Sequence, residues 1–170
     1  MTTLHIDMNQ QSNNEPIELM SFSNDTCVVG DGACTNPMIN RMTDRKQLAG
    51  LIVVSGMKIR ESAHLSHLKF VGGYAAHKDL EIFYSELTDL LDTFAESFSG
   101  RYEIIDQYPL VLTNGLSLED PIEYISSYRS LIDISRSRCE LSSELCNALD
   151  NIVELCNLTL NRLRHGRGLC

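Results

Sequence analysis

Residues 74–98 read YAAHKDLEIFYSELTDLLDTFAESF, and the large side chains in this stretch recur at alternating spacings of three and four. The recurring positions are His77, Leu80, Tyr84, Leu87, Leu91, Phe94 and Phe98. Such spacings place these residues on one face of an α-helix, which completes a turn in about 3.6 residues. The stretch therefore predicts a long helix that packs its apolar face inside a helix bundle.

Three further helices are predicted from the sequence on either side of this stretch. Asp120 followed by Pro121 is typical of a helix start, and Gly100 is expected to end the preceding helix. The predicted helices cover residues 43 to about 72, 74–98, 120–137 and 142–166. Gly50 and Gly56 lie inside the first of them, where each costs about 1 kcal/mol relative to alanine. We expect a close contact with a neighbouring helix to compensate for that cost.

The segment between the second and third predicted helices is long. Residues 101–116, RYEIIDQYPLVLTNGL, show no helical period and contain Pro109 and an Asn114–Gly115 turn signal. A connection of about fifteen residues can span a bundle from one end to the other. The sequence thus predicts an all-α fold, a four-helix bundle with a long crossover between its second and third helices.

Residues 1–42 differ in character from the rest of the chain. They are rich in Asn, Ser, Thr and Gly and have no helical period, which predicts an extended or partly disordered arm. Residues 43–170 then form the bundle, and a chain of 170 residues fits one such domain.

The charge of the chain bears on its partners. A net charge of −9 disfavours direct DNA binding and anionic membranes, because Lys and Arg supply most of the affinity for phosphate. No apolar run approaches the roughly 20 residues of a membrane span, and the amino terminus is not typical of a secretion signal. We therefore expect a cytoplasmic protein.

Histidines and carboxylates suggest a metal site. His64, His67 and His77 lie close together in the sequence, and Asp92 and Glu96 follow at helical spacing. His77 and Asp92 are separated by about 22 Å along a helix, so one chain cannot bring them together. Two copies packed antiparallel about a two-fold axis could do so. Imidazole and carboxylate ligands suit iron and also admit zinc or manganese.

This order of a His ending one helix, a short loop, a His opening the next, then Asp at +15 and Glu at +19 resembles the Dps-like mini-ferritins of the ferritin-like superfamily. The resemblance implies a ferritin-like bundle and a ferroxidase centre between subunits, with iron as the cofactor. The implied catalytic and metal-binding residues are His67, His77, Asp92 and Glu96, with His64 as a spare metal ligand. It also implies a homo-oligomer, a cage built on two-fold contacts.

A second hypothesis stays open. Leu68 stands where that family usually has a tryptophan, and the chain also resembles ferritin-like proteins of tailed bacteriophages. It could then be a non-catalytic virion component whose arm, residues 1–42, binds phage or host proteins. Whether the chain is an enzyme is thus undecided at this level. Glu81, Glu86 and Asp89 are expected on the solvated side of their helix, or lining a cavity that attracts cations.

Overall fold

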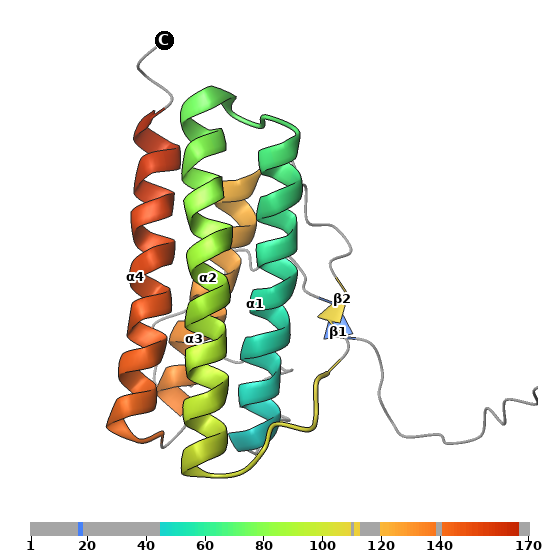
Figure 1. The fold of residues 1–170 in the computed structure, drawn as a ribbon, viewed down its shortest axis with the longest axis vertical. Coiled ribbons are helices and arrows are strands. Elements are labelled where there is room, and N and C mark those ends of the chain that lie inside the picture. The colour runs from blue at the N-terminus through green and yellow to red at the C-terminus, as the bar shows by residue number, and fades with distance from the viewer. Residues whose placement is uncertain (1–16, 19–44, 110, 113–119, 139–140, 167–170) are drawn as a thin grey trace, which may run out of the picture.

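The fold is an all-α four-helix bundle, as predicted (Figure 1). A computed structural model describes residues 17–18, 45–109, 111–112, 120–138 and 141–166. The elements are β1 (Ile17–Glu18), α1 (Arg45–Leu68), α2 (Gly73–Arg101), β2 (Val111–Leu112), α3 (Pro121–Arg138) and α4 (Ser143–His165). No helix among the described residues is both long and apolar enough to cross a membrane.

The order of the helices around the bundle agrees with the predicted crossover. Helix α1 packs against α2 and α3, and α4 packs against the same two helices, so α2 and α3 lie on a diagonal. In Figure 1, α2 ends at the lower end of the bundle and α3 begins at the upper end. The connection between them therefore joins opposite ends. Part of it, β2, pairs in parallel with β1, a contact that the sequence did not predict.

All four helices contribute to the core, including the predicted apolar face of α2 and two large tyrosines of α3. Of the seven positions in the α2 pattern, five are buried, namely Leu80, Leu87, Leu91, Phe94 and Phe98. Tyr124 and Tyr128 are fully buried as well, and burial raises the pKa of both hydroxyls. The Tyr128 hydroxyl donates to the Ile52 carbonyl over 3.2 Å, which ties α3 to α1.

The close helix contact expected at Gly56 is confirmed by its packing. A Cβ at Gly56 would meet the Tyr128 hydroxyl and a methyl group of Leu91, so three helices converge there. Gly50 differs from the expectation, because its close neighbour is the Gln107 carbonyl in the crossover rather than a helix. The cost of both glycines is thus compensated by close packing, although with different partners.

The helix ends are mostly where the sequence predicts them. The Asp120 carboxylate accepts from the backbone amides of Ile122 and Glu123, each over 3.1 Å, and so caps α3 as expected. Helix α2 ends at Arg101, one residue past the expected stop at Gly100, and α1 ends at Leu68, a few residues before the predicted end near residue 72. Apart from Ile17–Glu18, the predicted arm of residues 1–42 lies outside the described residues.

Candidate metal centre

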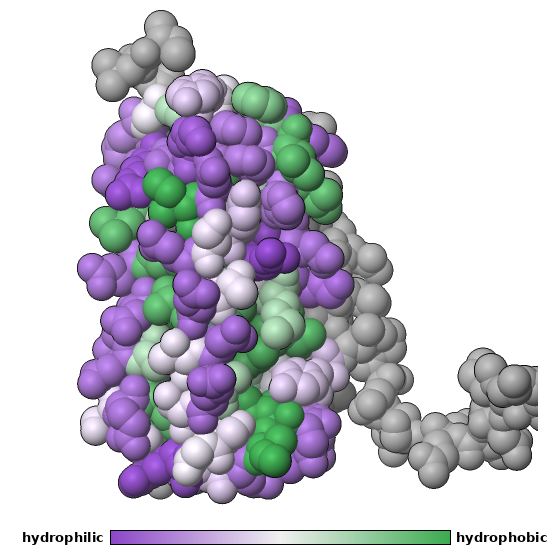
Figure 2. Space-filling model, in the orientation of Figure 1, coloured by the Kyte–Doolittle hydropathy of each residue, from purple (hydrophilic) through white to green (hydrophobic). Residues whose placement is uncertain are grey.

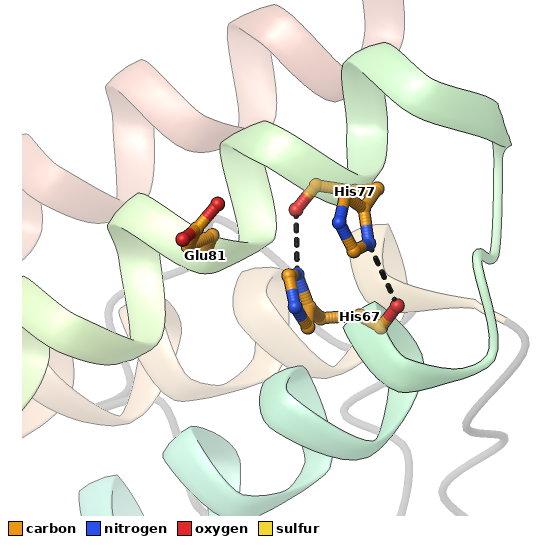
Figure 3. A group of neighbouring side chains, drawn as sticks. All are labelled: His67, His77 and Glu81. Atoms are coloured by element: carbon orange, nitrogen blue, oxygen red, sulfur yellow. Dashed lines mark hydrogen bonds between the residues drawn. The ribbon is translucent and has the colours of Figure 1, made fainter.

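The turn between α1 and α2 positions the candidate site. Phe70, Gly72 and Gly73 adopt positive φ angles of 55°, 80° and 85°. Glycine tolerates that region, whereas a phenylalanine there costs on the order of 1–3 kcal/mol. The turn brings the last residues of α1 next to the first turn of α2, so that His67 and His77 face each other (Figure 3).

The two histidines are joined by a reciprocal pair of hydrogen bonds. His67 Nδ1 lies 2.8 Å from the His77 carbonyl oxygen, and His77 Nδ1 lies 2.9 Å from the His67 carbonyl oxygen. The His67 carbonyl sits in the last turn of α1, where carbonyls lack a partner within the helix, so the His77 ring helps to cap that end. The rings stack with centroids 3.7 Å apart and planes 15° from parallel.

These bonds fix which ring nitrogen carries the proton. A carbonyl oxygen can only accept, so each Nδ1 must be the donor, Nδ1–H. In a neutral imidazole the other nitrogen, Nε2, then holds a free lone pair. Histidine ligands of metals commonly have this arrangement, in which a backbone carbonyl fixes the tautomer and leaves the second nitrogen for the ion.

Glu81 completes a group of three. It lies one helical turn after His77 on α2, and His67, His77 and Glu81 each offer a ligand atom within 4.8 Å of the other two. Lys78 bonds the carboxylate over 2.6 Å and lowers the pKa of Glu81, so the group stays anionic well into the acid range. All three side chains are half-buried, which leaves them open to an ion from solvent.

Sequence reasoning missed Glu81 as a candidate ligand, although it singled out both histidines. It assigned Glu81 to the solvated side of α2 or to a cavity lining. The signal that was available is the His77-x-x-x-Glu81 spacing, since residues four apart on a helix lie on the same face.

His64 lies near this group but outside it. Its ring centroid is 6.2 Å from that of His67 and 4.5 Å from that of Tyr84. Tyr84 also contacts the His67 ring edge-on, with centroids 5.4 Å apart. His64 and Tyr84 therefore extend the aromatic cluster along α1 and α2, and the predicted role of His64 as a ligand stays a prediction.

Asp92 and Glu96 do not reach the histidines within one chain. Both are exposed on α2, and Asp92 is about 22 Å along the helix from His77. Neither forms an ion pair among the described residues. Their predicted meeting with the histidines of a second copy stays a prediction.

The interior of the bundle contains no carboxylate cluster. Among the described residues no Asp, Glu or His is buried, and the buried polar side chains outside the tyrosines are all hydroxyls of Ser and Thr. They are Ser55, Ser62, Ser66, Ser127, Ser135 and Thr159. The candidate group found among the described residues therefore lies at the α1–α2 end, outside the core.

Comparison with known proteins gives one match. The model of DUF5856, described as a family of unknown function, covers residues 67–163. That range begins at His67 and contains His77, Glu81, Asp92 and Glu96. No curated protein and no solved structure matches the chain, so no ferritin or Dps relative supports the resemblance seen in the sequence.

Proposed function

We propose that this chain, which belongs to the DUF5856 family, binds a divalent transition-metal ion through His67, His77 and Glu81. The observation that carries the proposal is the reciprocal pair of Nδ1–H bonds, which leaves an Nε2 lone pair on each of two adjacent imidazoles. An anionic carboxylate within 4.8 Å supplies the third ligand.

The ligand types narrow the choice of ion. Two imidazoles and one carboxylate with open positions are typical of mononuclear non-haem Fe(II), and zinc and manganese also accept them. Calcium and magnesium prefer oxygen ligands alone and would bind weakly. Iron, zinc and manganese are therefore the candidates. Iron comes first, because the resemblance to Dps-like proteins implies iron.

Substitution of Glu81 tests the site. Glu81→Gln keeps the size of the side chain but removes its charge, so we expect the affinity for Zn(II) to fall at least about 10-fold. The measurement is isothermal titration calorimetry of the full chain. Glu86→Gln is the matched control, because Glu86 is an exposed acid farther along α2 and outside the group. Equal affinities for the two variants would reject Glu81 as a ligand.

A more specific proposal is that the protein is a Dps-like ferroxidase. Two copies of the chain, paired antiparallel in a cytoplasmic homo-oligomer or cage, would add Asp92 and Glu96 of one copy to His67 and His77 of the other. Support comes from the exposure of both carboxylates and from the coordination positions that three ligands leave open. Two Fe(II) ions would supply the two electrons that reduce one peroxide, with two protons, to two waters.

The rate of Fe(II) oxidation distinguishes the Dps-like ferroxidase from a protein that only binds metal. The double variant Asp92→Asn/Glu96→Gln should oxidise Fe(II) at least about 10-fold more slowly than the wild type, because the second copy no longer completes the centre. Its Zn(II) affinity should stay within about 3-fold, because the ligands in one chain are intact. The absorbance change on adding peroxide to the Fe(II)-loaded protein measures the oxidation rate. Native mass measures the oligomeric state. Equal rates, or a monomeric wild type that oxidises iron, would rule out the two-copy centre.

A second candidate function is a non-catalytic interaction protein, such as a virion component. Exposed apolar side chains favour it, since Leu65, Leu68, Phe70 and Tyr74 are between 45% and 71% exposed around the α1–α2 turn. Figure 2 shows hydrophobic surface at this end of the bundle.

Self-association through this end can be tested directly. Leu65→Ser/Leu68→Ser should lower the native mass if a second copy packs on these residues. Met57→Ser is the control, because Met57 is equally exposed on α1 but farther from the turn. A native mass that neither variant changes would leave metal binding as the better-supported function.

A further inference from the structure

We propose that the His67 ring turns out of its stack with His77 when an ion binds. This inference rests on the metal site proposed above. The site would then fill in two steps, with His77 and Glu81 holding the ion first and His67 joining afterwards. The three ligand groups are already neighbours, but the two rings are not oriented to share an ion.

The reason lies in the direction of the lone pairs. An imidazole nitrogen binds a metal in the plane of its ring, at about 2.0–2.1 Å. The His67 and His77 rings stack with centroids 3.7 Å apart and planes only 15° from parallel. Because the rings are stacked face to face, an ion in the plane of one ring lies outside the plane of the other and cannot meet the in-plane lone pair of both nitrogens. At most one of the two rings can bind the ion until a ring moves.

His77 is the ring held in place. Phe70 stacks on it with centroids 4.1 Å apart and planes 4° from parallel, and His67 covers its other face. Tyr74 adds a third, more distant ring contact at 6.2 Å. His77 also shares α2 with Glu81 at a spacing that the helix fixes, so these two ligands can meet an ion without a backbone change.

His67 is freer to turn. Its ring stacks on one side only, against His77. Its other ring contacts, with Tyr84 at 5.4 Å and His64 at 6.2 Å, are edge-on or tilted. Turning costs one hydrogen bond, from His67 Nδ1–H to the His77 carbonyl. That carbonyl lies inside α2, where the backbone bond of the helix also uses it, so it is not left without a partner. The metal–nitrogen bond gained by the ring offsets the hydrogen bond lost.

Nitrogen NMR of the histidine side chains tests the inference on the full chain. With ¹⁵N-labelled histidine and Zn(II), which is diamagnetic, we expect the Nε2 signals of both His67 and His77 to shift. His77 should keep the signal of its hydrogen-bonded Nδ1–H, whereas the corresponding His67 signal should disappear or move. His165, exposed at the end of α4, serves as the internal control and should not respond.

Other outcomes would show whether the proposed turn of His67 or the proposed metal site is wrong. If both Nε2 signals shift while both Nδ1–H signals stay, or if the His77 Nδ1–H signal is the one that changes, the proposed turn of His67 is wrong although metal binding stands. If neither Nε2 signal shifts at saturating Zn(II), the metal site itself is wrong. A further check is His67→Gln, which should bind Zn(II) in a single kinetic phase, whereas the wild type shows a second phase independent of Zn(II) concentration.

Discussion

Replacing His77 by alanine is expected to weaken Zn(II) binding at least about 100-fold, the largest effect of any single substitution at the site. The substitution removes one ligand and also the ring that stacks between Phe70 and His67. It removes the side-chain cap on the His67 carbonyl as well. Calorimetric titration of the full chain with Zn(II) measures the loss.

Two controls accompany this prediction, one for the specificity of the substitution and one for folding. His165→Ala removes an exposed histidine in the last turn of α4, at the same end of the bundle but outside the group of three, and should leave the affinity within about 2-fold of the wild type. Circular dichroism should show that His77→Ala keeps its helices, because His77 is only half-buried and the core lies elsewhere. A folded His77→Ala protein that binds Zn(II) as tightly as the wild type would contradict the proposed site.

Gly56→Val should lower the free energy of unfolding by about 3 kcal/mol or more, a large effect for a single substitution. A Cβ at this position would lie 2.6 Å from a methyl carbon of Leu91 and would also meet the Tyr128 hydroxyl. Neither neighbour can move away easily, since both side chains are buried and the Tyr128 hydroxyl is bonded to the Ile52 carbonyl. Urea denaturation followed by circular dichroism measures the change.

Gly100→Ala provides the matched control for this prediction. Gly100 also lies inside a helix, but a Cβ there would meet nothing within 4 Å. The alanine should therefore raise the free energy of unfolding by about 0.5–1 kcal/mol, because glycine has the larger conformational entropy in the unfolded chain. If both variants lost stability equally, the close contact at Gly56 would not be the cause.

Most of the fold could be predicted from local patterns. The three- and four-residue spacing of α2 and the Asp120–Pro121 start of α3 are local signals, and both correspond to the observed elements. Helix α2 runs one residue past the expected stop at Gly100, and one local and one tertiary contact hold the residue just beyond it. The ring of Tyr102 packs on Phe98 and its hydroxyl accepts from the Ser142 amide, so the helix is stabilised past the glycine.

The candidate site could be predicted only in part. The sequence placed His67 and His77 on either side of a short helix junction, but it did not predict that their rings stack on each other there. The reciprocal bonds between them depend on the backbone path of the turn, including the positive φ of Phe70, which no residue preference for phenylalanine would suggest. Glu81 was missed because an acid one turn after a histidine is common on helix surfaces, and its proximity to His67 is a tertiary contact.

The placement of the candidate ligands at a helix hairpin has a consequence for the order of folding. His67, His77 and Glu81 span only fifteen residues of sequence, so bringing them together closes a short loop at small entropic cost. An ion held there would stabilise the α1–α2 hairpin before α3 arrives across the long crossover. We therefore expect metal to speed refolding, by favouring this early hairpin, in addition to slowing the unfolding of the finished bundle.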